Sequence, residues 1–169
     1  RGVHRGARTA VGSAIRQRAA VATKRWVWPL VVDMPFPLDS ILAALPLMDT
    51  HQSVISYRSN DPRNAYRKVQ SLVFNGLVRL LLGTRARHTN SAFKVTDAAL
   101  FRSLDLRSNG WLLDAELLMR LEEKGIPYVE LPVPLIDRTV GRSTIGPGAA
   151  VSAFRDLVRL SMNRRRRRR

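Results

Sequence analysis

The chain has 169 residues, of which 45% are hydrophobic and none is cysteine. This length supports one domain with a substantial core, and the lack of cysteine excludes disulfides and thiolate metal sites. Lys and Arg number 29 against 13 Asp and Glu, a net charge of +16. That excess favours polyanionic partners, namely nucleic acid, anionic lipid or phosphorylated substrates. No apolar run approaches the ~20 residues that span a bilayer.

The chain opens with a helix and a strand. Residues 3–20 place small apolar side chains at helical spacing, which predicts a helix packed closely on a sheet. Residues 26–32 (WVWPLVV) predict a short buried strand, although Pro29 disfavours a fully paired central position. The strand ends at Asp33. An acid there can hold a divalent cation that bridges a diphosphate, or it is a turn aspartate that binds its own backbone.

A short helix over 40–45 and a strand over 53–57 that ends at Arg58 come next. The sequence Asn-Asp-Pro at 60–62 predicts the start of a long helix, and Gly83 its end. The apolar stripe of this helix contains Val69, Leu72, Val73, Leu77, Leu80 and Leu81.

Polar residues recur at every fourth position on a different face of this helix: Arg63, Arg67, Ser71 and Asn75. Together with Arg58, these side chains are able to grip an anionic headgroup, because arginine forks match phosphate oxygens in paired hydrogen bonds. The alternative is the solvated face of an amphipathic helix.

A helix over 96–104 precedes the segment 111–143, which predicts a helix, a tight turn at Gly125, an extended run and a polar loop. Asp114 and Glu116 lie about 200° apart on the helix. One therefore faces a cleft, as a possible general base, while the other caps the helix or favours its dipole. First-turn acids are also common without any chemistry. The run ends at Glu130, and the loop RTVGRS is either a phosphate clamp or a basic surface loop.

Residues 149–162 predict a basic amphipathic helix that continues into six arginines, which is typical of an element that meets a membrane surface or an acidic partner. The three histidines, at positions 4, 51 and 88, are scattered and indicate no metal site.

The order of these motifs resembles the later part of a family-2 glycosyltransferase with the GT-A fold, in the dolichyl-phosphate mannosyltransferase-like branch. The resemblance covers roughly residues 1–145, and its most specific pieces are EKGIPYVELPV with RTVGRS, and RKVQSLVFNGLVRLLLG with NSAFK. It implies an α/β fold: a partial GT-A (Rossmann-like) nucleotide-diphospho-sugar transferase domain over 1–148, with a mixed sheet flanked by helices. Residues 149–169 form the basic helix and arginine tail.

The resemblance also implies a function and a set of site residues. Such enzymes move a sugar, with inversion, from a nucleotide-diphosphate sugar to a polyprenyl phosphate. Asp33 would be the first acid of the DxD motif that binds a divalent metal, Mg or Mn. The acid facing the acceptor would be Asp114, with Lys94 and Glu116 in support. The residues that would meet phosphate are Arg58, Arg67, Ser71, Arg138 and Ser143.

The chain departs from the family pattern at three places. Pro35 replaces the second acid of DxD, so Asp39 is the candidate substitute from the same turn. His88 or a neighbour replaces the acid before the FK segment. The family's first strands, which hold the base and ribose, are missing, and we therefore expect a fragment that lacks an N-terminal part.

We expect a cytoplasmic protein, peripheral at the inner face of the membrane, whose partners are a nucleotide-diphosphate sugar, a lipid-phosphate acceptor and, through 149–169, an anionic membrane surface. Pro35 keeps open a non-catalytic relative. The charge of +16 keeps open a nucleic-acid-binding module. Against that module, the tryptophans lie in apolar runs rather than between basic groups as stacking platforms would.

Overall fold

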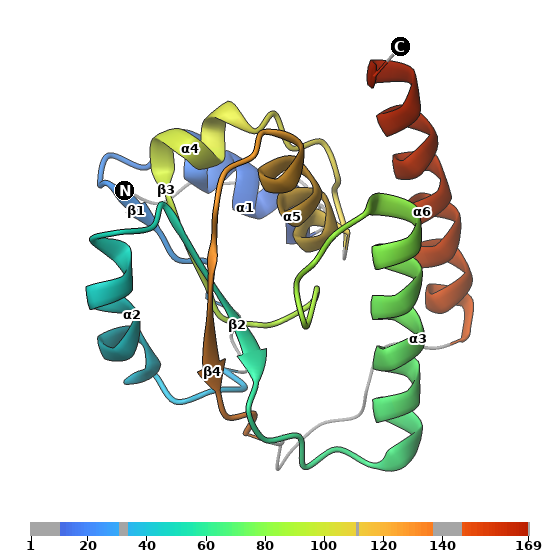
Figure 1. Ribbon diagram of the computed structural model, residues 1–169, viewed down its shortest axis with the longest axis horizontal. Helices are drawn as coiled ribbons and strands as arrows, with labels where there is room; N and C mark the ends of the chain where they lie inside the picture. The colour runs from blue at the N-terminus through green and yellow to red at the C-terminus, as the bar shows by residue number, and fades with distance from the viewer. Residues whose placement is uncertain (1–10, 31–33, 111, 137–146, 169) are drawn as a thin grey trace.

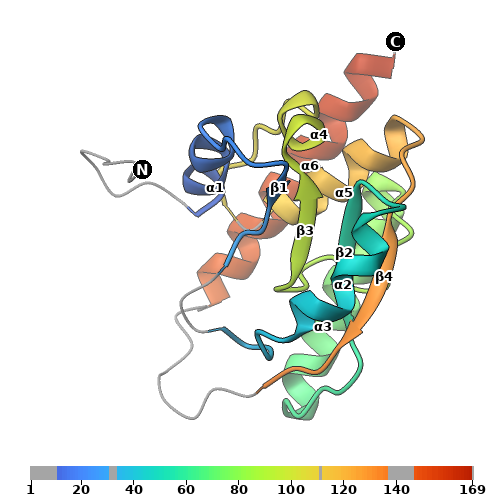
Figure 2. The ribbon, with the colours of Figure 1, turned by 90° about the vertical axis from the view of Figure 1, so that its left-hand side faces the viewer.

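The computed structural model describes residues 11–30, 34–110, 112–136 and 147–168, with the backbone alone for 147–150 and 165–168. Four strands form one sheet in the order β1-β3-β2-β4 (Figure 2): β1 (Trp26–Val27), β2 (Ser53–Arg58), β3 (Lys94–Asp97) and β4 (Val129–Val133). β2 and β4 are parallel, whereas β3 is antiparallel to β1 and β2. The sheet is therefore mixed, as predicted.

Two strands differ from their predicted lengths. β1 covers only residues 26 and 27 of the predicted run 26–32, and residues 31–33 lie outside the described part of the chain. β4 continues past Glu130 and includes Pro132. Proline is tolerated there because β4 is an edge strand, so the missing N–H faces away from the ladder.

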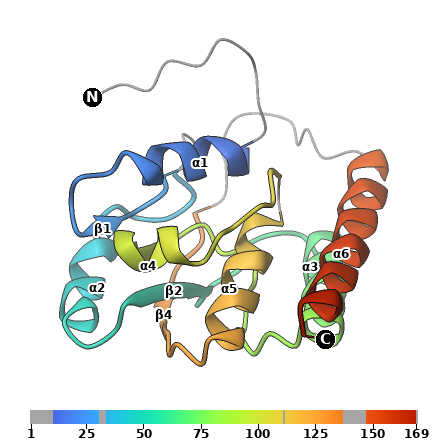
Figure 3. The same cartoon turned by 90° about the horizontal axis from the view of Figure 1, so that it is seen from above.

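Helices lie on both faces of the sheet (Figures 1 and 3). Val54 of β2 packs with Ala44 of α2 on one face, and the next residue, Ile55, packs with Leu118 of α5 on the other. The helices on the α5 side are α1 (Val11–Ala20), α4 (Ala98–Ser103) and α5 (Leu113–Glu123), and α2 spans Ser40–Met48. α3 (Ala65–Leu82) and α6 (Pro147–Arg168) lie side by side on the same side as α5 and farther from the sheet (Figure 3).

The long helix starts later than predicted. Asn64 is its N-cap, with Oδ1 accepting the backbone N–H of Arg67 at 3.0 Å, so the predicted start at 60–62 is wrong by one turn. Residues 60–62 belong to the loop from β2. The helix ends as predicted at Gly83, whose φ of 66° is the left-handed conformation that glycine adopts without steric cost.

α3 turns most of its apolar stripe toward solvent. Leu72 and Leu80 are 73% and 80% exposed, and Val69 and Val73 are also exposed. The buried side of the helix instead carries Asn75, Val78 and Leu82. Phe74, Leu77 and Leu81 are half-buried and pack against the same core cluster, so both faces of α3 carry apolar residues. Periodicity alone therefore does not tell which face turns inward.

α6 packs on α3 and α5 through Leu157, which is fully buried beside Val78 and Met119. The Ser161 hydroxyl donates to the Leu81 carbonyl at 3.2 Å, and the Arg164 guanidinium lies 3.0 Å from the Glu123 carboxylate. In the described part of the chain, every helix is too short or too polar to cross a membrane.

Candidate functional site

The candidate site lies at the carboxyl edge of β2 and β4. Because these strands are parallel and Arg58 pairs in register with Val133, both strands end at this edge. β3 runs the other way and therefore begins there, with Lys94. In open α/β sheets, ligands bind outside the carboxyl ends of the strands.

Arg58 is the centre of a cluster that joins β2, α3 and the following loop. Its guanidinium donates to the Ser71 hydroxyl at 3.0 Å and to the Asn90 carbonyl at 3.2 Å. Asn75, one turn after Ser71, accepts the backbone N–H of Thr89 at 2.9 Å. The sequence pattern thus placed Ser71 and Asn75 correctly on one face, and this face meets Arg58.

The loop between α3 and β3 is fixed by carboxylates and a guanidinium. The N–H groups of Arg85 and Arg87 donate to Glu122 and Glu130 at 2.6 and 2.7 Å. Arg79 donates to the carbonyl of Ala86 at 3.1 Å. These bonds hold the backbone that presents the residues after Arg87 to the site.

A pocket of about 320 Å³ opens between this loop and α3. Four cationic side chains and one carboxylate are among its lining residues, which are Asp61, Arg63, Lys68, Ser71, Leu72, Asn75, Gly76, Arg79, Arg87 and His88. The carboxylate, Asp61, is already held by Arg63 through two hydrogen bonds of 2.7 and 2.5 Å. The remaining positive charge makes the pocket suited to an anion such as phosphate.

Burial and the neighbouring cations shift the pKa values of groups in and beside the pocket. Burial lowers the pKa of the Arg58 guanidinium, and the charge of Arg63 lowers this pKa further. The hydrogen bond from Arg63 lowers the pKa of Asp61 to about 2. Burial, followed by the charge of Arg58, lowers the pKa of His88 below its usual 6.5, so that this imidazole is neutral at pH 7.

Lys94 and Asp114 form an ion pair next to the pocket. The buried Lys94 Nζ lies 3.0 Å from Asp114 Oδ2 and also donates to the Ser91 carbonyl. Asp114 is in the first turn of α5, where the helix dipole stabilises a carboxylate. Its side chain is 35% exposed, so it presents a neutralised carboxylate to the edge of the site.

Other predicted site residues lie apart from this cluster. Arg67 is exposed on α3 and is not among the residues that line the pocket, whereas its neighbour Lys68 is. Glu116 is 1% exposed and accepts the N–H groups of Arg107 and Ser108 at 2.8 and 2.6 Å. Glu116 thus fixes the loop before α5, a role that differs from the predicted cap.

The predicted metal-binding turn is described only in part. Asp39 is exposed at the N-terminus of α2, without a side-chain cap hydrogen bond. Asp33, Arg138 and Ser143 lie outside the described residues. Within residues 11–30, 34–110, 112–136 and 147–168, no three His, Asp or Glu side chains gather as metal ligands. One exposed carboxylate does not by itself fit a divalent cation, which takes six or more oxygen ligands.

The turn that carries Pro35 and Asp39 is hydrogen-bonded to the segment after β4. The backbone N–H of Ile136, three residues after β4, donates to the Pro35 carbonyl at 2.8 Å. The turn after β1 is therefore anchored to the segment that leads into RTVGRS.

Comparison with known proteins identifies the fold. The crystal structure of glucosyl-3-phosphoglycerate synthase from Mycobacterium tuberculosis in complex with phosphoglyceric acid matches 92% of this chain and 55% of its own, with a TM-score of 0.64 at 18% identity. The structure of the same enzyme in complex with Mn²⁺, uridine diphosphate and phosphoglyceric acid covers 92% of this chain and 53% of the enzyme, with a TM-score of 0.65 at 19% identity. The chain has the GT-A fold.

One relative is similar to this chain in sequence over part of its length. Glycosyltransferase AglD of Haloferax volcanii is 38% identical over 69 residues, which make up 40% of this chain and 11% of the relative. No protein-family model matches the chain. The chain spans about half the length of the solved GT-A structures that it matches.

Part of the pocket was not predicted from the sequence. The every-fourth spacing of polar residues from Arg63 to Asn75 continues to Arg79, so the sequence does carry a signal for that residue. His88 was expected only as a replacement for an acid. Its place beside Arg58 depends on a contact between residues 30 positions apart, which periodicity does not reveal.

The Asp61–Arg63 pair predicts a pH effect on stability. Since the pKa of Asp61 is lowered to about 2 in the folded protein, the unfolded chain binds the proton more tightly, and the stabilisation is lost as pH falls from about 4 to 2. We expect urea unfolding to show a smaller loss of stability over this range in Asp61→Asn than in wild type. Asp156→Asn, at an exposed and weakly paired site, is the control. Equal losses in Asp61→Asn and wild type would contradict the assignment.

Proposed function

We propose that the chain belongs to an inverting glycosyltransferase that moves a sugar from a nucleotide-diphosphate sugar to a lipid phosphate. The observation that carries this proposal is the cationic pocket at the carboxyl edge of a GT-A sheet, where Arg58 is oriented by Ser71 and Asn90. The similarity to Glycosyltransferase AglD supports sugar transfer as the reaction class.

A phosphate acceptor simplifies the chemistry required of the protein. A phosphate monoester is already an anionic nucleophile, so its oxygen attacks the sugar carbon while the nucleotide diphosphate leaves. Catalysis then depends on holding the two reactants in line and on neutralising charge. Lys68 and Arg79 supply positive charge in the pocket lining, and Arg58 lies beside it, bound to Ser71. Asp114 with its partner Lys94 lies at the adjacent edge. Arg138 and Ser143 remain the predicted closing residues over phosphate.

The exposed face of α3 favours a lipid over a small acceptor. Tyr66, Val69, Leu72, Val73 and Leu80 are 56% to 80% exposed and fall within one arc of the helix at 100° per residue. Leu72 also lines the pocket, so the apolar face begins at the pocket mouth. The small acceptor in the solved structures, phosphoglyceric acid, is the alternative.

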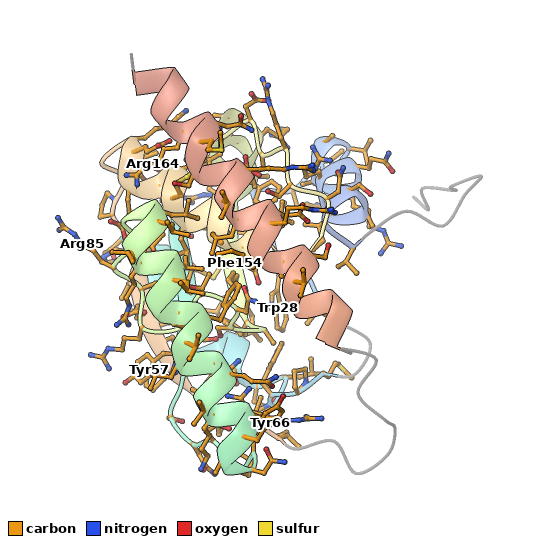
Figure 4. All side chains as sticks on the ribbon, turned by 90° about the vertical axis from the view of Figure 1, so that its right-hand side faces the viewer. Trp28, Tyr57, Tyr66, Arg85, Phe154 and Arg164 are labelled. Carbon is orange, nitrogen blue, oxygen red and sulfur yellow. The ribbon has the colours of Figure 1, made fainter. Side chains whose placement is uncertain are left out.

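The same face supports an anionic membrane surface as the partner. Figure 4 shows α3 and α6 next to each other, with Tyr66 and Phe154 labelled, and Phe154 is 50% exposed. Lys68 and Arg79 border the apolar arc of α3, and Arg155 and Arg159 are exposed on α6. Apolar residues flanked by cations match an anionic bilayer, whereas a second copy would oppose like charges.

Sugar transfer is tested on the full-length protein with radiolabelled donor and either polyprenyl phosphate or phosphoglyceric acid. We expect transfer to the lipid, and Arg58→Lys to lower kcat/KM for the acceptor roughly tenfold or more, through loss of paired hydrogen bonds to phosphate. Arg25→Ala, an exposed pair with Asp97 on the β1 side, is the control. Unchanged activity in both Arg67→Ala and Arg138→Ala would remove those two residues from the site. Transfer only to phosphoglyceric acid would refute the lipid acceptor.

Membrane binding is tested by flotation with phosphatidylcholine vesicles that contain or lack phosphatidylserine. We expect binding to the anionic vesicles alone, with Val69→Ser combined with Leu80→Ser reducing the salt-resistant part and deletion of residues 165–169 reducing the salt-sensitive part. Leu42→Ser, at a 61% exposed position on α2, controls for general surface hydrophobicity. Binding that depends only on residues 165–169 would exclude a role for α3.

A divalent metal in the donor site is supported by the solved structures of the M. tuberculosis enzyme with Mn²⁺ or Mg²⁺ and uridine diphosphate. We place it at Asp33, with Asp39 in the role that Pro35 leaves open. Calorimetry of uridine diphosphate with Mn²⁺, on the full-length protein, should show binding lost in Asp33→Asn, weakened in Asp39→Asn and strengthened in Pro35→Asp. Asp49→Asn is the control. Wild type that binds neither metal nor nucleotide would favour the non-catalytic relative.

A further inference from the structure

His88 lies in the anion pocket, and its ring is oriented by the residue that centres the site. The backbone N–H of Arg58 donates to His88 Nδ1 at 3.2 Å. Nδ1 is therefore the acceptor nitrogen of the neutral ring, and the ring proton is on Nε2. His88 is half-buried and lines the pocket, so Nε2–H is the group that it offers to a ligand.

The surroundings keep this ring neutral. Arg58 at the end of β2, Arg63 before α3 and Arg79 on α3 each disfavour a second positive charge on the imidazole, and Asp61 alone opposes them. Asp61 is itself held by two hydrogen bonds from Arg63. Lys68 adds a further positive charge to the pocket lining, and Arg87 lies there with its guanidinium 3.5 Å from the Glu130 carboxylate. A proton on Nδ1 would also point at the Arg58 backbone N–H, so two donors would face each other and the hydrogen bond would be lost.

We propose that His88 is a neutral hydrogen-bond donor, fixed in its Nε2–H tautomer by the Arg58 backbone, that binds and positions the phosphate group in this pocket. The proposal rests on the proposed function in that the phosphate is the acceptor's. The arginines supply the charge that attracts the anion. His88 adds a directed hydrogen bond without adding another cation beside them, which a lysine or arginine at this position would do.

Two substitutions separate the donor role from a merely structural one. The Oδ1 of asparagine reaches the place of Nδ1, so His88→Asn keeps an acceptor for the Arg58 N–H, while its NH2 group stops short of the place of Nε2. The glutamine amide reaches the place of Nε2, so His88→Gln keeps a donor toward the pocket. His51→Gln, at a half-buried histidine beside Thr50, is the matched control.

The experiment measures sulfate binding to the full chain by NMR and calorimetry, because sulfate keeps one charge state between pH 6 and 8.5 whereas phosphate titrates in this range. We expect the ring nitrogens of His88 to report the Nε2–H tautomer and to shift with sulfate. His88→Asn should bind sulfate roughly tenfold or more weakly, the effect of losing one hydrogen bond to a charged group. His88→Gln should recover most of the affinity, and wild-type affinity should stay nearly constant across the pH range.

Several results would overturn the proposal. If His88→Gln bound sulfate weakly and His88→Asn bound it normally, the role of His88 would be limited to accepting the Arg58 backbone N–H. Affinity that rises steeply as pH falls, with uptake of one proton, would mean an imidazolium. Equal affinity in all variants would mean that His88 does not touch the anion, while the phosphate pocket would stand. Wild type that binds no sulfate would refute the pocket itself, and the proposed function with it. If either variant fails to fold, the tautomer and pH dependence of the wild type still decide.

Discussion

The half-buried guanidinium of Arg58 sets the arrangement of the site. Taking a charge out of water is costly unless hydrogen bonds replace its hydration. Ser71 of α3 and the Asn90 carbonyl provide those bonds, so the Ser71 side of α3 must face the end of β2. The apolar residues on the opposite side of the helix are then left facing solvent. The contacts of Arg58, together with the packing of Val78 and Leu82 against α5 and α6, thus fix both the pocket and the exposed face beside it.

Much of the fold was predictable because its signals are local. Apolar periodicity gives the existence of α3, Gly83 gives its end, and the run from Ser53 gives β2. Which face of α3 turns inward was not predictable, since periodicity compares faces of a helix without reference to the rest of the protein. The length of β4 was missed for a similar reason. Pro132 is acceptable only on an edge strand, and the order of strands is not a local property.

Some of the residues predicted from the sequence for a site lie together in the structure. Arg58, Ser71, Lys94 and Asp114 were singled out by motif order and family resemblance, and the structure brings them to one edge of the sheet. His88 and Arg87 were not assigned to the phosphate site, because the loop that carries them is positioned by Glu122 and Glu130 from distant parts of the chain. Long-range contacts of this kind leave no spacing pattern in the sequence. Asp33, the predicted metal ligand, lies outside the described residues.

Two consecutive backbone carbonyls, those of Asn90 and Ser91, each bind one cation of the site. The carbonyl of Asn90 accepts from Arg58, and the carbonyl of Ser91, the next residue, accepts from Lys94, which pairs with Asp114. The two carbonyls belong to consecutive planar peptide units that meet at the Cα of Ser91, so the two cations hold neighbouring points of the same backbone. A ligand that draws Arg58 into the pocket would therefore shift the support of Lys94 as well. Binding of a ligand at Arg58 and the position of the Lys94–Asp114 pair would therefore be coupled through the backbone at Ser91.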